Sequence, residues 1–130
     1  MIIPFNQPKR ENDLFASEIN HVIQTVLSSG IYILGEQCSM FEKEFSQFCQ
    51  VRHCCAVANG TDALEIALRA IGVETGDEVI TVANAGGYST IACILIGAVP
   101  VYVDVDPGSL LLDLNLLPTA LTPRTKCVIA

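Results

Sequence analysis

The sequence predicts an α/β fold in three layers, with a mostly parallel sheet covered by helices on both faces. Four apolar runs rich in valine and isoleucine begin at residues 54, 78, 100 and 126, which are 24, 22 and 26 residues apart, and helical patterns lie between them. These intervals fit a strand–helix–strand unit. The runs also show little alternation of apolar and polar residues, which is typical of strands buried on both faces.

Two helices are expected before the first of these strands. The first runs from Asn12, which can cap it, to Ser29, and Gly30 ends it. The second starts at Ser39, which can form a capping box with Glu42. The apolar stripe of the first helix consists of Phe15, Ile19, Val22, Ile23, Val26 and Leu27, and that of the second of Phe41, Phe45 and Phe48.

The remaining elements alternate along the chain. Strands are expected at 54–58, 78–82, 100–105 and 126–130, and helices at 62–71, 89–96 and, with a weaker pattern, 114–121. We expect a single domain, in which residues 1–50 form a helical arm and residues 51–130 begin the α/β part. The last run has no turn or cap behind it, so we expect the chain to be a piece of a longer protein.

Composition argues against several classes of partner. Acidic residues number 14 against 7 basic ones, which gives a net charge of −7, and no basic cluster exceeds Lys9-Arg10, so no nucleic acid is expected to bind. The segment 91–103, at the end of an uncharged stretch, contains Gly97 and Pro100 and is shorter than the ~20 residues that a membrane helix needs. Since the N-terminus also lacks a signal-peptide core, we expect a cytoplasmic protein without membrane contact.

The six cysteines do not form a Cys-x-x-Cys pair. We therefore expect free, buried thiols and no metal site. Asp104 and Asp106 stand at the end of an expected strand, where ligands gather in α/β sheets. With no other ligands nearby in the sequence, a turn before Pro107 is the better interpretation.

Residues 54–64 predict an anion-binding site. An apolar run leads through Asn59, Gly60 and Thr61 into a helix. The first N–H groups of a helix are unpaired and carry about half a positive charge, so they can hold a phosphate. Gly60 would let an anion approach the backbone, and Thr61 would add a hydroxyl donor. The same residues also suit a plain helix cap, and the residues alone leave both interpretations open; an Asn-Gly hairpin is excluded by the helical pattern that follows.

Several motifs follow one another in order along the chain. They are 59–64 (Asn-Gly-Thr-Asp-Ala-Leu), 76–80 (Gly-Asp-Glu-Val-Ile), 97–101 (Gly-Ala-x-Pro-Val) and 103–107 (Val-Asp-Val-Asp-Pro), with weaker matches at 29–35, 41–45 and 122–126. Together they resemble the DegT/DnrJ/StrS family of sugar aminotransferases over nearly all 130 residues. The resemblance implies the N-terminal part of the large domain of a fold-type-I, aspartate-aminotransferase-like, pyridoxal-phosphate transferase.

The resemblance also implies roles for particular residues. Gly60 and Thr61 would hold the phosphate of pyridoxal 5′-phosphate. The family usually places an aromatic side chain, which stacks on the pyridine ring, three residues before a threonine. Here that position is Gly87, and the aromatic residue, Tyr88, comes one place later. Either Tyr88 stacks through a shifted loop, or stacking comes from elsewhere.

No catalytic residue is expected in this chain. A covalently held cofactor needs a lysine in a cofactor loop, and none of Lys9, Lys43 and Lys126 follows a strand into such a loop. The family's Schiff-base lysine would lie beyond residue 130, so we expect the 130-residue piece to be inactive by itself.

The implied function is transfer of an amino group from an amino acid, glutamate in our expectation, to a nucleotide-linked keto sugar, in polysaccharide or antibiotic-sugar biosynthesis. The alternatives are a pyridoxamine-phosphate-dependent sugar dehydratase of the same family and a non-catalytic phosphate-binding α/β module. The resemblance further implies a homodimer, and the apolar segment 30–35, set between two helices, either reaches a partner subunit or packs on its own core.

Overall fold

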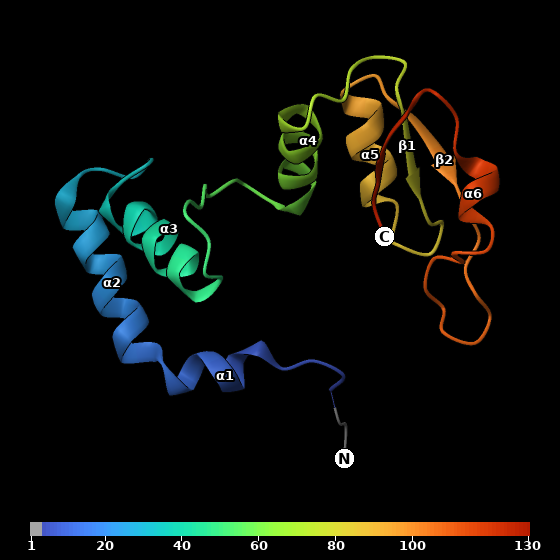
Figure 1. Cartoon of the computed structure of the whole chain (residues 1–130). Helices are drawn as coiled ribbons and strands as arrows, with labels where there is room; N and C mark the ends of the chain where they lie inside the picture. The colour runs from blue at the N-terminus through green and yellow to red at the C-terminus, as the bar shows by residue number, and fades with distance from the viewer. Residues whose placement is uncertain (1–3) are drawn as a thin grey trace. The chain divides into compact units, whose positions relative to one another are not determined.

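A computed structural model describes residues 4–130, which fall into two compact units, Met1–Ala56 and Val57–Ala130 (Figure 1). The first unit is helical, and the second contains all the strands among the described residues.

The first unit contains α1 (Pro8–Leu14), α2 (Ala16–Ser29) and α3 (Glu36–Phe48). The expected single helix from Asn12 is therefore wrong at its start. Pro8 opens α1, where its missing N–H costs nothing, and the helices are separated at Phe15, whose φ is −111° and ψ is 11°. The expected end is confirmed, since Gly30 adopts a left-handed φ of 69° after α2.

The capping box at Ser39 and Glu42 is also wrong. Helix α3 already begins at Glu36, and the carbonyl of Gly35 accepts the N–H groups of Cys38 and Ser39 at 3.1 and 3.2 Å. Ser39 therefore lies inside α3 and is not its N-cap. The phenylalanine stripe is confirmed: the ring centroids of Phe41 and Phe45 lie 5.4 Å apart in a stacked arrangement.

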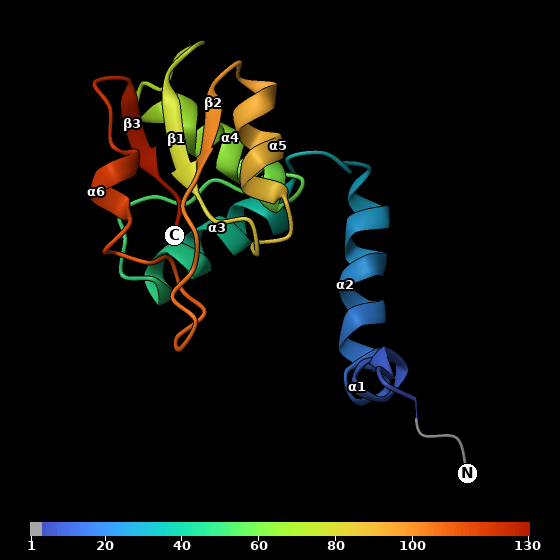
Figure 2. The same ribbon diagram turned by 90° about the vertical axis from the view of Figure 1, so that its right-hand side faces the viewer.

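The second unit is a parallel sheet with helices against it. Strands β1 (Glu78–Thr81), β2 (Val99–Tyr102) and β3 (Thr125–Val128) lie in the order β2-β1-β3, all parallel (Figure 2). Helices α4 (Gly60–Ala70) and α5 (Tyr88–Leu95) lie on one side, and the single turn α6 (Leu117–Ala120) on the other. The α/β prediction with a parallel sheet is confirmed.

The expected strand at 54–58 does not form among the described residues. A strand needs a neighbour, and these residues pair with none of the three strands of the sheet. The segment is extended but is held by a side chain instead, since the Glu42 carboxylate accepts the Ala56 N–H at 2.8 Å.

Strand β1 divides two apolar cores. Val79 packs on one face with Leu68 of α4 and Cys93 of α5, and Ile80 packs on the other face with Val103 and Leu112. All four residues of β1 are buried, whereas β2 and β3 are only partly covered. The expectation that the strands are buried on both faces therefore holds for β1 alone within residues 4–130.

Glu78 fixes the amino end of the sheet. Its carboxylate is only 5% exposed and accepts hydrogen bonds from Thr122 Oγ1 at 2.6 Å and from Arg124 Nε at 3.0 Å and Nη2 at 2.5 Å. Its N–H donates to the Arg124 carbonyl at 2.8 Å, so backbone and side chain together hold the start of β3 beside β1. The pairing register then shifts between Glu78 and Val79. The Thr122 hydroxyl first, and then Arg124, hold the pKa of the Glu78 carboxyl below its ordinary value.

This network predicts a pH-dependent stability. A carboxyl whose folded-state pKa lies below its unfolded-state pKa contributes stability above the unfolded-state value and loses it as the pH falls through the folded-state value. The free energy of unfolding should therefore fall from about pH 4.5 downward, and Glu78→Gln should lower it at pH 7 while flattening this acid dependence. Denaturant titrations between pH 3 and pH 7 measure both effects. Glu74→Gln, at an exposed position, is the matched control; an equal acid slope in both variants would contradict the assignment.

Candidate functional site

The candidate site begins at the first turn of α4. Asn59 has extended backbone (φ −162°, ψ 175°), and its Oδ1 accepts the Asp62 N–H at 2.9 Å. The Asn59 carbonyl accepts the Ala63 N–H at 3.1 Å. Within residues 4–130 the N–H groups of Gly60 and Thr61 have no protein acceptor, as expected for the first groups of a helix.

The sequence left open whether this turn is a plain helix cap or an anion-binding site, and the structure assigns the two roles to different residues. Asn59 is the cap, so the Thr61 hydroxyl is not consumed in capping, and no hydrogen bond ties it to another group among residues 4–130. A Cβ placed on Gly60 would meet nothing within 4 Å, so the space beside its α-carbon is open. The turn is therefore both capped and able to accept an anion.

A hollow of about 380 Å³ lies beside this turn, and its lining consists of Asn59, Gly60, Thr61, Leu64 and Tyr88. The structure thus brings the three predicted cofactor-binding residues together within one unit. Tyr88 is the first residue of α5, so the opening turns of two helices line the hollow. Their dipoles place positive potential there. Asn59 and Leu64 were missed as lining residues; the cap preference of asparagine was the available signal for Asn59.

The aromatic side chain at the hollow is that of Tyr88, one residue after position 87, where the family spacing puts it. Gly87 is the N-cap of α5 with a left-handed φ of 77°, and it presents no side chain to the hollow. Tyr88 is 60% exposed, so its ring is available to a flat ligand. The lining has the features that pyridoxal phosphate requires: free N–H donors and a hydroxyl for the phosphate, with Leu64 and an aromatic ring for its apolar part.

The described residues supply no covalent anchor at this hollow. None of Lys9, Lys43 and Lys126 is among its lining residues; Lys9 pairs with Asp13 at 2.5 Å on α1 instead. Across residues 4–130, no three His, Cys, Asp or Glu side chains converge as a metal site would require. In the same range, no helix is long and apolar enough to cross a membrane.

The cysteines differ from expectation in their burial. All six are free, but only Cys93 is buried, and Cys49 and Cys55 are exposed. Burial raises the pKa of the Cys93 thiol, which makes it a poor nucleophile. Asp106 behaves as expected in a turn: its Oδ1 accepts the Ser109 N–H at 2.7 Å and the Gly108 N–H at 3.1 Å.

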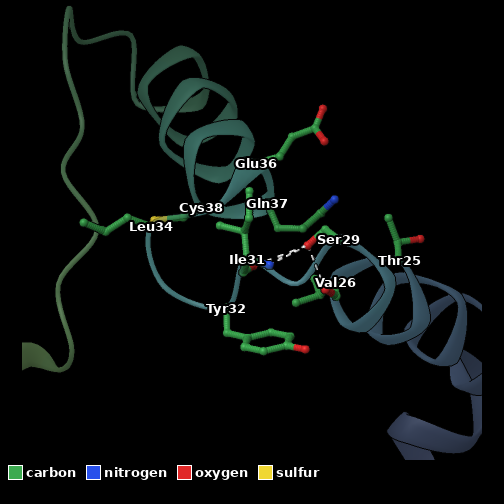
Figure 3. A pocket seen from close by; sticks show the side chains of 10 residues that line it. Thr25, Val26, Ser29, Ile31, Tyr32, Leu34, Glu36, Gln37 and Cys38 are labelled. Atoms are coloured by element: carbon green, nitrogen blue, oxygen red, sulfur yellow. Dashed lines mark hydrogen bonds between the residues drawn. The ribbon is translucent and has the colours of Figure 1, made fainter.

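The first unit has a smaller hollow of about 190 Å³ between the end of α2 and the start of α3 (Figure 3). The Ser29 hydroxyl there donates to the Val26 carbonyl at 2.8 Å and accepts the Ile31 N–H at 3.1 Å, so it is occupied within its own turn. The segment that follows is exposed, with Tyr32 67% and Ile33 83% accessible. Among residues 4–130, the apolar side chains of segment 30–35 are therefore not covered by a core.

Comparisons with known proteins identify the family of the chain. A family model described as the DegT/DnrJ/EryC1/StrS aminotransferase family matches residues 13–130. UDP-2-acetamido-2-deoxy-3-oxo-D-glucuronate aminotransferase of Pseudomonas aeruginosa is 42% identical over 128 residues, covering 98% of this chain and 36% of that protein.

Solved structures give the same result. DesV of Streptomyces venezuelae, in complex with a ketimine intermediate, has a TM-score of 0.92 at 37% identity, over 97% of this chain and 34% of that one. NtdA of Bacillus subtilis with bound cofactor PMP has a TM-score of 0.89 at 35% identity, over 97% of this chain and 29% of that one.

The fold is that of the fold-type-I pyridoxal-phosphate transferases. Within that class the chain belongs to the DegT/DnrJ/EryC1/StrS aminotransferase family, whose members use pyridoxal 5′-phosphate. The chain spans about a third of the length of the relatives that it matches.

Proposed function

We propose that the whole protein of which this chain forms part transfers an amino group from glutamate to a nucleotide-linked keto sugar. The observation that carries the proposal is the shared hollow of Gly60, Thr61 and Tyr88 at the opening turns of two helices. The name of the Pseudomonas aeruginosa relative, a UDP-linked 3-oxo sugar aminotransferase, supports a nucleotide-linked keto sugar as acceptor. Glutamate as donor follows from the family resemblance. Free thiols fit the reducing cytoplasm, where we place the protein.

Each residue of the hollow has a defined task in this proposal. The N–H groups of Gly60 and Thr61 and the Thr61 hydroxyl donate to the cofactor phosphate, whose charge the helix dipoles stabilise. Tyr88 covers the face of the cofactor ring, and Leu64 keeps water from that side. When bound, pyridoxal phosphate supplies the carrier that takes the amino group from the donor and passes it to the sugar. The lysine that holds it is supplied by the rest of the whole protein.

Amino transfer is the direct test of this function. The whole protein, given a UDP-linked 3-oxo sugar and glutamate, should form 2-oxoglutarate and the amino sugar in equal amounts, which coupled enzymatic assay and mass spectrometry measure. The 130-residue chain alone should show no turnover, because it lacks the covalent anchor. Water loss from the sugar without 2-oxoglutarate would instead identify a dehydratase, and turnover by the chain alone would contradict the assignment of the anchor.

Thr61 is expected to matter for cofactor retention more than for folding. In the whole protein, Thr61→Val should weaken cofactor binding by about 1–3 kcal/mol, because a hydrogen bond to a charged group is lost while the shape is kept. Thr61→Ser should retain most of the affinity. Equilibrium dialysis measures the cofactor dissociation constant, with Thr25→Val, at an exposed site on α2, as the control. Unchanged affinity in Thr61→Val would leave Thr61 as part of the helix start only.

The exposed segment 30–35 supports a homodimer. Its apolar side chains, more than half accessible here, have the character of an interface core. We expect sedimentation of the whole protein at micromolar concentration to give a dimer, and Ile33→Asp to shift it toward monomer because a charge would be buried. Gln24→Asp, which adds the same charge at a polar position, should leave the dimer intact. A wild-type monomer, or equal behaviour of the two variants, would contradict this role.

A further inference from the structure

The loop between β1 and α5, residues 82–87, carries Tyr88 to the hollow and is anchored at one point by Asn84. The Asn84 Nδ2 donates to the carbonyl of Leu110 at 3.1 Å, across 26 residues of sequence. Leu110 has a left-handed φ of 59° and belongs to a turn that has its own hydrogen bonds. In that turn the Leu110 N–H donates to the Asp106 carbonyl at 2.8 Å, and the Asp106 N–H donates to the Leu111 carbonyl at 2.9 Å. Asn84 is therefore tied to an ordered acceptor.

Gly86 makes a second, closer contact with the aromatic residue. A Cβ on Gly86 would lie 3.0 Å from Cε2 and 3.3 Å from Cδ2 of Tyr88, so the edge of the ring lies against the bare α-carbon. Gly87 has nearly the same backbone, with φ 77° against 70°, but a Cβ there would meet nothing within 4 Å. The two glycines thus share a left-handed φ, but only Gly86 makes room for the ring.

The two glycines precede the aromatic residue, which comes one position later than the family spacing implies. Both have a left-handed φ, which glycine adopts more readily than other residues. The chain thus turns just before Tyr88, which lines the hollow.

We infer that Asn84 and Gly86 are positioning residues, which fix the ring of Tyr88 beside the anion-binding turn of Gly60 and Thr61. The inference rests on the proposed function, in which Tyr88 covers the cofactor ring. It adds that the orientation of this ring is set by the loop, through the missing side chain at Gly86 and the amide of Asn84.

The first experiment compares Gly86→Ala with Gly87→Ala in the whole protein. Both place alanine in a left-handed conformation, so the cost in backbone strain is matched. Gly86→Ala should weaken binding of pyridoxamine 5′-phosphate about tenfold more than Gly87→Ala does, in line with the loss of one aromatic stacking contact. Calorimetry gives the dissociation constant, and circular dichroism of the bound cofactor reports the orientation of the aromatic environment. The excess should vanish when Tyr88→Ala is present in both variants.

A second comparison tests the anchor. Asn84→Asp keeps the shape of the side chain but removes the donor to Leu110, so it should alter the cofactor circular dichroism and weaken binding several-fold. Asn115→Asp is the control, because Asn115 bonds only within its own turn, to Asp113. If the alanine variants fold poorly, Gly86→Asn and Gly87→Asn repeat the first comparison, since asparagine tolerates left-handed backbone.

The outcomes separate this inference from the function on which it rests. If Tyr88→Ala leaves the dissociation constant unchanged, the role of Tyr88 in the proposed function fails, and the positioning role fails with it. A second outcome is that Tyr88→Ala weakens binding, but each test variant has the same dissociation constant as its control. The pairs are Gly86→Ala with Gly87→Ala and Asn84→Asp with Asn115→Asp. In that case only the positioning inference is overturned. A Gly86 effect that persists without Tyr88 would also overturn it, because the contact would then act elsewhere.

Discussion

The complete burial of β1 is the constraint on which the second unit depends. Val79 and Ile80 are adjacent and wholly inaccessible, and their side chains point to opposite faces because a strand alternates. Each face must therefore be covered, by α4 and α5 on one side and by α6 with the 103–112 segment on the other. The backbone groups of β1 need partners on both edges, which β2 and β3 supply. Parallel pairing then sends the strands to a common carboxyl end, and the connection to α5 leaves from there.

The two ends of this sheet have different tasks. At the amino end, Glu78 binds Thr122 and Arg124 and holds the start of β3 beside β1, so charge there serves the fold. At the carboxyl end, a polar contact joins α5 to the sheet. The Thr90 hydroxyl of α5 lies 2.7 Å from the hydroxyl of Tyr102, the last residue of β2.

The sequence predicted those features that depend on local pattern. The parallel sheet, the start of α4 and the end of α2 follow from apolar runs and from Gly30, each readable within a few residues. The predictions failed where residues far apart in the sequence determine the local structure. Residues 54–58 would form a strand only by pairing with another strand, and such long-range pairing is invisible in the sequence. Ser39 and Glu42 satisfy a capping pattern, but Gly35 starts the helix earlier, and Glu42 instead holds the Ala56 N–H. Three lining residues of the hollow, Gly60, Thr61 and Tyr88, were anticipated from the family resemblance. The closeness of Gly86 to the ring of Tyr88 required coordinates.

In the proposed function, holding the cofactor is separated from reacting with it. An anion at the opening of α4 gains from N–H groups that any helix leaves unpaired, and Asn59 caps the helix without occupying Gly60 or Thr61. A ring beside Tyr88 gains from contact area that needs no ionisable group. Neither contribution requires a nucleophile, and no lysine of residues 4–130 is among the residues that line the hollow. The described residues therefore supply affinity and orientation. Orienting a cofactor requires that the Tyr88 ring be fixed. Because the ring follows a glycine-containing loop, it needs contacts that hold the loop in place. In the inference drawn above, these are the close approach of Gly86 to the ring and the hydrogen bond of Asn84 to Leu110.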